Sequence, residues 1–489
     1  MPMARAPRWF WLAALCAFGA SAWVARGYLL DDAFIHLRYA EHAAAGEWFA
    51  YNTGEPSFGC SSIPWILLLA QLGRLVPHHH WPVLVKVLSL VFNLASLLVL
   101  ARLTLRSPLA QHVRTRTLLL MTALVLLALP TSIRWLQDGM ETSLAVLLAL
   151  LCIWRALAVE ARDEPPLTAI AGAVLLSSPG VLRIDLVPLS LCAALLATVR
   201  GRRFALIGSM IPILAFQLWV RFHQGSFLPD TALAKASGAF SPSFLLWFAV
   251  ATAGATPAWF AGPLAAIAGA LHALRQRSWR SLMDWSALLA PLGLTLLMGV
   301  LRGQAIQGPR YFLPALAFSI AGSLLLCPDL AEPALRKLHV SLGLIWAALL
   351  AQFLFTFASL PRLLAPTTIE LPPALTRPSA RLAAFDIGLL GWSTEGVIED
   401  WSGLVHGREV ARAGSAARRC LLAARHGFPD ALVLTEVQAS QSGAEDGKLR
   451  LDCPAGVVRY RDSGRSAVVL QHLGKTVSWS LWLPEPDRS

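Results

Sequence analysis

The chain has 489 residues, of which 56% are hydrophobic and only 14% are charged, and its formal net charge is +12. Soluble domains carry roughly 25% charged residues, so the composition excludes an ordinary soluble enzyme and predicts a polytopic α-helical membrane protein. The basic residues stand in small groups between apolar runs rather than along one soluble face, which argues against nucleic-acid binding.

Apolar runs of roughly membrane-spanning length follow one another over residues 1–360 and predict about eleven transmembrane helices. The first run follows a basic N-terminus and has no clear cleavage site after it, so we expect it to be retained as a membrane helix. The runs are 9–29, 81–100, 117–136, 142–157, 167–181, 186–199, 204–220, 245–274, 285–301, 311–327 and 339–360.

Basic groups occur in every second connection between these runs, which predicts the orientation of the chain. The positive-inside rule places those connections and the N-terminus in the cytoplasm, in a protein that crosses the bilayer many times. The remaining loops then face the periplasm, and they hold most of the unusual ionisable residues, which are costly at a bilayer boundary unless they face a cavity or each other. These residues are Asp31, Asp32, Glu55, Asp138, Glu141, Arg183, Asp185, Asp230, Lys235, Arg302 and Arg310.

The first periplasmic loop, residues 31–80, is unusually long for a connection. It begins with two adjacent carboxylates, Asp31 and Asp32, at the predicted start of an amphipathic helix. A helix cap accounts for one of them but not for the second. The apolar segment 63–76 is short for a membrane span, and we expect it to lie at the interface.

The composition changes after residue 360. Residues 361–380 form a Pro-rich linker, and residues 381–489 have the pattern of a periplasmic α/β domain. We expect buried strands at 382–390 and 431–435, a helix at 408–426 and a strand-rich end at 456–482. Cys420 and Cys453 either pair in this oxidising compartment or remain free thiols.

Neither a metal site nor a cofactor is predicted. No Cys-x-x-Cys pair occurs, and the three consecutive residues His78, His79 and His80 cannot all point toward one ion. Nearby cations can stabilise a leaving phosphate without a metal, although a divalent cation is left open.

Charged residues at helix ends on one membrane face favour group transfer from a lipid-linked donor. A transporter or flippase of an envelope lipid is the alternative, but it predicts charges near the bilayer midplane and internal repeats. A non-catalytic scaffold that binds glycan is a third hypothesis.

Five motifs in order along the chain carry a family resemblance. The first loop reads Asp31-Asp32-Ala33-Phe34-Ile35-x-x-Arg38-Tyr39-Ala40, then Gly46 and Tyr51-Asn52-x-Gly54-Glu55-Pro56. The others are Gly139-Met140-Glu141-Thr142, Leu228-Pro229-Asp230-Thr231-x-x-Ala234-Lys235, Arg310-Tyr311-x-x-Pro314, and Asp386-Ile387-Gly388 followed by Asp400-x-x-Gly403-Leu404. They resemble bacterial GT-C-fold glycosyltransferases related to the terminal β-(1→2)-arabinofuranosyltransferases.

The resemblance implies a GT-C-like membrane domain, a polyprenyl-phosphate sugar as donor, and a cell-envelope glycan or glycolipid as acceptor. It implies that Asp31 or Asp32 is catalytic and leaves the choice between them open. Lys235 and Arg310 are then the candidates for the lipid phosphate, because an Arg fork or a Lys point charge suits that group. The other expected substrate-binding residues are Arg38, Tyr39, Glu55, Glu141, Arg183, Asp185 and Asp230.

The chain departs from the group's pattern in several places. It reads Phe58-Gly59-Cys60-Ser61-Ser62 where the group commonly has Glu-Gly-Tyr-Thr-Asn, and Leu182-Arg183-Ile184-Asp185-Leu186 where the group often has Thr-Arg-Pro-Glu-Gly. Asp230 also stands where Asn is usual, and His36 where a smaller residue is usual. These changes are consistent with a different sugar or with weakened activity, so the sugar, the acceptor and the stereochemical outcome stay open.

Overall fold

The computed structural model divides the chain into two compact units. The helical unit comprises Met1–Arg26, Lys86–His223 and Ser237–Leu360, and the loop–sheet unit comprises Gly27–Val85, Gln224–Ala236 and Pro361–Ser489. The first long loop therefore belongs to the same compact unit as the C-terminal residues. The structure describes residues 6–128, 135–158, 164–234, 257–302, 309–328, 333–336, 338–340, 342–343, 346–347, 368–369, 371–472 and 475–485.

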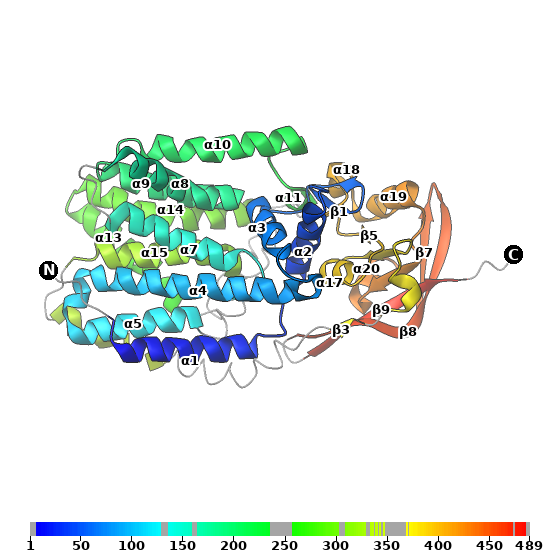
Figure 1. Ribbon diagram of the computed structural model, residues 1–489, viewed down its shortest axis with the longest axis horizontal. Coiled ribbons are helices and arrows are strands. Elements are labelled where there is room, and N and C mark those ends of the chain that lie inside the picture. Colours follow the sequence, from blue (N-terminus) through cyan, green and yellow to red (C-terminus); the bar gives the residue numbers. More distant parts are fainter. Residues whose placement is uncertain are drawn as a thin grey trace. The chain divides into compact units, whose positions relative to one another are not determined.

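The helical unit is a bundle of long helices that lie side by side (Figure 1). Its core is apolar and includes Phe10, Phe18, Phe312 and Phe318, each at most 2% exposed. The helices are α1 (Arg8–Val24), most of α4 (Trp81–Arg106), α5 (Val113–Ala128), α7 (Thr142–Ile153), α8 (Pro166–Leu182), α9 (Val187–Val199), most of α10 (Ala205–Gln224), α13 (Ala261–Arg275), α14 (Trp279–Arg302) and α15 (Leu313–Leu326).

Some polar side chains inside this bundle donate hydrogen bonds to the backbone, which lowers the cost of their apolar surroundings. Thr104 donates its hydroxyl to the Leu100 carbonyl at 2.8 Å, and Asn93 donates its amide to the Leu127 carbonyl at 3.2 Å. By length and composition, two helices of the described residues could cross a membrane, His78–Arg106 and Ala205–Gln224. The predicted spans at 245–274 and 339–360 fall partly outside the described residues, and the number of eleven stays a prediction.

The loop–sheet unit combines helices of the first loop with a mixed sheet. The first loop forms α2 (Asp31–Ala44), the hairpin β1 (Ala50–Asn52) and β2 (Glu55–Pro56), and α3 (Ile63–Gly73). The C-terminal part contains β3 (Thr368–Ile369), β4 (Arg381–Ala384), α17 (Gly388–Trp392), β5 (Val397–Asp400), α18 (Arg408–Arg412), α19 (Ser415–His426), β6 (Ala431–Leu434), α20 (Glu436–Gln441), β7 (Lys448–Cys453), β8 (Gly456–His472) and β9 (Lys475–Pro484), and α11 (Asp230–Ala234) joins the unit from the middle of the chain.

The sheet has the strand order β3-β8-β9-β6-β4-β5, and β7 pairs with β8. The β4 strand is parallel to both β5 and β6, whereas the long β8–β9 hairpin is antiparallel. The alternating burial of β7 shows why its sequence forms a strand at the surface, with Leu449, Leu451 and Cys453 inward and the residues between them exposed. Trp401, Leu434 and Trp482 belong to the hydrophobic core of the loop–sheet unit.

The structure shortens one strand that the sequence predicts and decides how two cysteines are paired. The strand expected at 382–390 ends at Ala384, and α17 begins at Gly388 because two of its amides are held by a side chain from the first loop, described below. Cys420 and Cys453, whose pairing the sequence left open, form a disulfide between α19 and β7.

Candidate functional site

The first carboxylate of the first loop has two backbone partners. Asp31 and Asp32 are the first two residues of α2, as the sequence predicts. The Asp31 carboxylate accepts the backbone N–H of Gly388 at 2.9 Å and that of Leu389 at 2.8 Å. Both of its oxygens are therefore engaged by the start of α17, which the carboxylate caps.

Asp31 and α17 fit so closely that only glycine can stand at position 388. A Cβ atom added to Gly388 would lie 1.8 Å from the Asp31 carbonyl oxygen. The pKa of Asp31 is raised to about 7, chiefly by burial and also by the charges of Asp386 and Asp32, and the two backbone hydrogen bonds oppose the rise. The pair therefore contains one carboxylate that titrates near neutral pH and is fixed in position.

Arg38 joins the first loop to the C-terminal residues. It is 5% exposed, and it donates to the carbonyls of Tyr51 at 2.8 Å, of Thr394 and Gly396 at 2.9 Å each, and of Gly391. A guanidinium with these four protein carbonyls as acceptors has most of its donors committed. The residue expected from the sequence to bind substrate thus holds the loop in place.

Tyr39 and Asp230 lie in the same part of the unit. The Tyr39 hydroxyl is 2.7 Å from the Ser57 hydroxyl and accepts the Gly59 N–H at 3.0 Å. Asp230 accepts the Phe58 N–H at 3.1 Å through its carboxylate, and its own N–H donates to the Phe58 carbonyl at 2.7 Å. Burial raises the pKa of Asp230, and the Phe58 hydrogen bond opposes that shift. These contacts pin α11 to the first loop.

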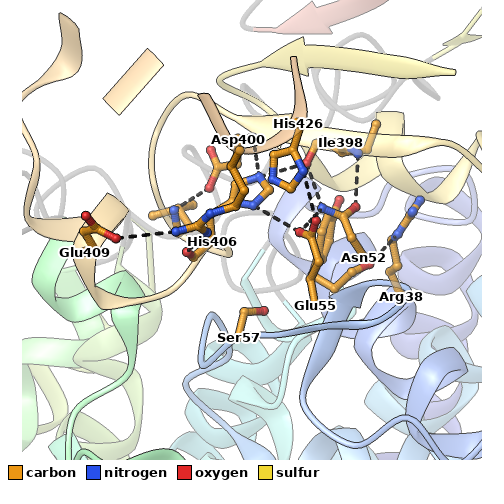
Figure 2. A network of polar contacts seen from close by, with 12 residues as sticks. Arg38, Asn52, Glu55, Ser57, Ile398, Asp400, His406, Glu409 and His426 are labelled. Carbon is orange, nitrogen blue, oxygen red and sulfur yellow. Dashed lines mark hydrogen bonds and ion pairs between the residues drawn. The ribbon is translucent and has the colours of Figure 1, made fainter. Parts of the chain in front are cut away.

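Glu55, in β2, faces two histidines of the C-terminal residues (Figure 2). One carboxylate oxygen is 3.2 Å from His426 Nδ1, and the other is 3.5 Å from His406 Nδ1. Burial alone raises the pKa of Glu55, but the His406 contact and the charge of His426 outweigh burial, and the net shift is downward. The carboxylate is therefore ionised at neutral pH.

In the helical unit, three of the predicted residues form one buried ion network. Arg183, which follows α8, donates to Glu141 at 3.0 Å and reaches both oxygens of Asp185, at 3.0 and 2.7 Å. Its guanidinium carbon also lies 4.6 Å from the ring centre of Tyr311. Arg183 and Glu141 are only 3% and 1% exposed, so this fork is rigid and shielded from solvent.

Arg310 and Asp138 extend this network. Arg310 is 2% exposed, lies over the Tyr311 ring at 5.2 Å, and interacts electrostatically with Asp138. Burial raises the pKa of Asp138 to about 7, and Arg310 opposes the rise. Lys86 also interacts with Asp138 and donates to the carbonyls of Ala25 and Gln137, at 2.8 and 2.7 Å. Three carboxylates and three cations thus gather at one set of helix ends.

The structure accordingly places the predicted residues in two groups. Glu141, Arg183, Asp185 and Arg310 meet in the helical unit, and Asp31, Asp32, Arg38, Tyr39, Glu55 and Asp230 lie in the loop–sheet unit. Lys235 lies outside the described residues.

The sequence analysis did not identify Lys86, His406 or His426 as candidates. Lys86 carried a usable signal, because it is a cation inside an apolar run. His406 and His426 stand alone in sequence and carried no comparable signal.

The helical unit also contains a half-open apolar cavity of about 690 Å³. Its lining comes mainly from α4, α5, α13, α14 and α15, with Leu100, Leu119, Trp285 and Ile320 among its residues, and Leu342 adds to it from the later part of the chain. Two of its lining residues, Leu109 after α4 and His272 in the last turn of α13, adjoin the basic connections. The ion network instead lies before α7, after α8 and before α15. The cavity and the ion network therefore belong to different helix ends.

The fold defined by these elements is that of GT-C enzymes. The chain is similar to the crystal structure of ArnT from Cupriavidus metallidurans bound to undecaprenyl phosphate, with a TM-score of 0.56 over 96% of this chain and 97% of that chain, at 12% sequence identity. At this identity the similarity shows the fold alone. It agrees with the predicted GT-C-like, mostly helical architecture.

In sequence, the chain is 28% identical over 248 residues to the terminal beta-(1->2)-arabinofuranosyltransferase of Mycobacterium tuberculosis. The match includes 48% of this chain and 39% of that relative, so the chain spans about two fifths of the length of the curated relative. No protein-family profile matches the chain. The two similarities confirm the resemblance to GT-C-fold glycosyltransferases that the sequence motifs indicate.

Proposed function

We propose that this protein is an inner-membrane glycosyltransferase that moves a sugar from a polyprenyl phosphate to a cell-envelope glycan or glycolipid on the periplasmic side. One observation carries the proposal: in a chain with this fold, buried carboxylates and cations form a network at helix ends, and a carboxylate pair opens the first loop. Burying these charges is costly unless they serve a purpose.

The acid pair divides into two roles in this proposal. Asp31 has both carboxylate oxygens committed to backbone amides, so it fixes the start of α2. We assign the role of general base to Asp32. It accepts the proton of an acceptor hydroxyl as that oxygen bonds to the anomeric carbon, while the bond from that carbon to the phosphate oxygen breaks and its electron pair leaves with the polyprenyl phosphate.

The leaving phosphate gains charge as the bond breaks, and a preorganised cation stabilises it. Arg310 supplies that cation in the proposal, together with Lys235 as the sequence motif implies. Arg183 is less suited to this role because its guanidinium is already committed to Glu141 and Asp185. It orients Glu141 instead. The sugar and the stereochemical outcome are not part of the proposal.

The test uses purified full-length protein, a panel of polyprenyl-phosphate sugars that includes arabinose, and an envelope glycan acceptor. Release of polyprenyl phosphate and formation of a new glycosidic bond are both measured. Asp32→Asn should lower the turnover rate about 100-fold or more, the usual range for loss of a general base. Arg310→Gln should also raise the KM for the donor.

Asp446→Asn is the matched control, because Asp446 is an exposed aspartate of the same unit, and it should retain full activity. Equal transfer by the wild type and by Asp32→Asn would refute the role of Asp32. Lipid-dependent movement across vesicles without any new glycosidic bond would refute the transferase proposal and support transport.

A further inference from the structure

Three side chains from distant parts of the sequence converge in the loop–sheet unit with the composition of a zinc site. They are Glu55 of β2, His406 of the connection between β5 and α18, and His426 at the end of α19. One ligand atom from each lies within 4.8 Å of the other two. We propose that these residues bind a divalent transition metal, most suitably Zn²⁺, which fastens the first loop to the C-terminal sheet.

The separations fit a tetrahedral ion. Zinc bonds of about 2.0–2.1 Å at tetrahedral angles place neighbouring ligand atoms about 3.3 Å apart. Glu55 Oε1 lies 3.2 Å from His426 Nδ1, and Glu55 Oε2 lies 3.5 Å from His406 Nδ1, so each carboxylate oxygen is at this spacing from one imidazole. Two imidazoles and one carboxylate are ligands that zinc prefers, and they leave a fourth position for water.

The buried imidazole of His406 provides an independent argument. Its side chain is fully buried, and among the described residues its Nδ1 has no hydrogen-bond partner. That nitrogen faces Glu55 at a distance too long for a good hydrogen bond (Figure 2). A buried polar atom left in this way is costly, and a metal ion between the two groups removes the cost.

The surrounding groups support the ligands as they do in known metal sites. His406 Nε2 lies 3.0 Å from the Ile398 carbonyl oxygen, the acceptor that its N–H needs when Nδ1 binds metal. The Asp400 backbone nitrogen lies equally close to Nε2 and donates to it in the tautomer that carries its proton on Nδ1. Metal binding at Nδ1 therefore selects the tautomer that is protonated on Nε2. Asn52 donates to Glu55 at 3.3 Å and to the Ile398 carbonyl at 3.0 Å.

Charge also favours a cation at this position. Glu55 supplies the carboxylate of the cluster, and its side chain is only 29% exposed. A doubly charged ion offsets this charge. The proposed metal does not take part in the sugar transfer, so the zinc proposal is tested independently of that activity.

The experiment removes metal from the purified full-length protein with a chelator, adds zinc, dialyses away the excess and measures the zinc that stays bound. We expect about one zinc per chain in the wild type, and a melting temperature that zinc raises and the chelator lowers. Glu55→Gln and His426→Gln should weaken zinc binding at least tenfold and remove the effect of zinc on melting. His79→Gln, an exposed histidine of the same loop, is the matched control and should bind zinc as the wild type does.

Failure of the wild type to bind zinc, or equal binding by all four proteins, would overturn the proposal. A second measurement needs no variant and covers misfolding. Zinc should protect His426, whose side chain is 11% exposed, from carbethoxylation in the wild type while His79 remains reactive, and the absence of such protection would equally overturn the proposal.

Discussion

Asp31 and Asp32 are neighbours in sequence, yet the structure gives Asp31 a defined structural partner. The sequence was sufficient to place both at the start of a helix in the first loop, because apolar periodicity and the preceding apolar run are local signals. It could not choose between them. The partner amides of Asp31 are 357 and 358 residues away, and a single sequence contains no record of such a contact.

Replacement of Gly388 by alanine tests how α17 positions Asp31. The added Cβ would overlap the Asp31 backbone, so the carboxylate must leave the Gly388 and Leu389 amides. We expect a melting temperature lower by several degrees, from a loss of about 1–3 kcal/mol for the two amides left without a partner, and a lower transfer rate. Differential scanning fluorimetry in detergent measures the first effect.

Gly414→Ala is the control, since a Cβ there meets nothing within 4 Å and the residue has φ −65°. Equal melting of both variants and the wild type would show that Asp31 does not depend on the close approach of Gly388.

At the scale of elements, the local pattern identified strands and helices but not where the chain changes from one to the other. The apolar run at 382–390 predicts one strand, whereas β4 stops at Ala384 and α17 follows. The contact that starts α17 comes from another part of the chain, so tertiary structure overrides the local preference. The β5 strand shows a second feature that periodicity does not reveal, the buried carboxylate of Glu399.

Glu399 makes the stability of the unit depend on pH. Burial raises its pKa from 4.5 to about 8, Arg381 opposes the rise, and Glu55 and Asp430 add to it. The folded state holds the proton of Glu399 more tightly than the unfolded state does. The stability that this proton gives is therefore complete below pH 4.5 and is lost as pH rises through about 8.

Glu399→Gln removes this dependence. We expect no gain in melting temperature at pH 5 and a clear gain at pH 9, worth at most about 5 kcal/mol. Thermal unfolding across this pH range measures the difference between the variant and the wild type. The exposed Glu395→Gln serves as the control. A Glu399→Gln curve that runs parallel to the wild type at every pH would show that Glu399 is ionised in the folded protein.

At the scale of the whole molecule, composition and basic connections were enough to predict a membrane protein with a C-terminal α/β part, because those signals are summed over many residues. The grouping of the first loop with the C-terminal residues could not be predicted from the sequence. It depends on a few specific long-range contacts rather than on signals summed over many residues. The disulfide between Cys420 and Cys453 is a further long-range feature, and it suits the periplasmic location that we propose for this unit.

Reduction of this disulfide should destabilise the loop–sheet unit. Its half-cystines are 33 residues apart, and opening a loop of that length costs about 3–4 kcal/mol in the chain-entropy description. We expect dithiothreitol to lower the melting temperature of the wild type to that of the double variant Cys420→Ser/Cys453→Ser, and to leave the variant unchanged. Thiol labelling of intact cells should detect no free thiol at either position, and efficient labelling there would contradict the periplasmic assignment.

The four carbonyls bound by Arg38 set an order of events during synthesis. Three of them belong to residues 391–396, more than 350 residues downstream of Arg38. At about 5–20 residues per second, the first loop waits roughly 18–70 s for these partners after it has been made. Until then Arg38 has only the Tyr51 carbonyl among its four final acceptors. The loop therefore assembles last although it is made first, and a chain cut short before residue 391 leaves it incomplete.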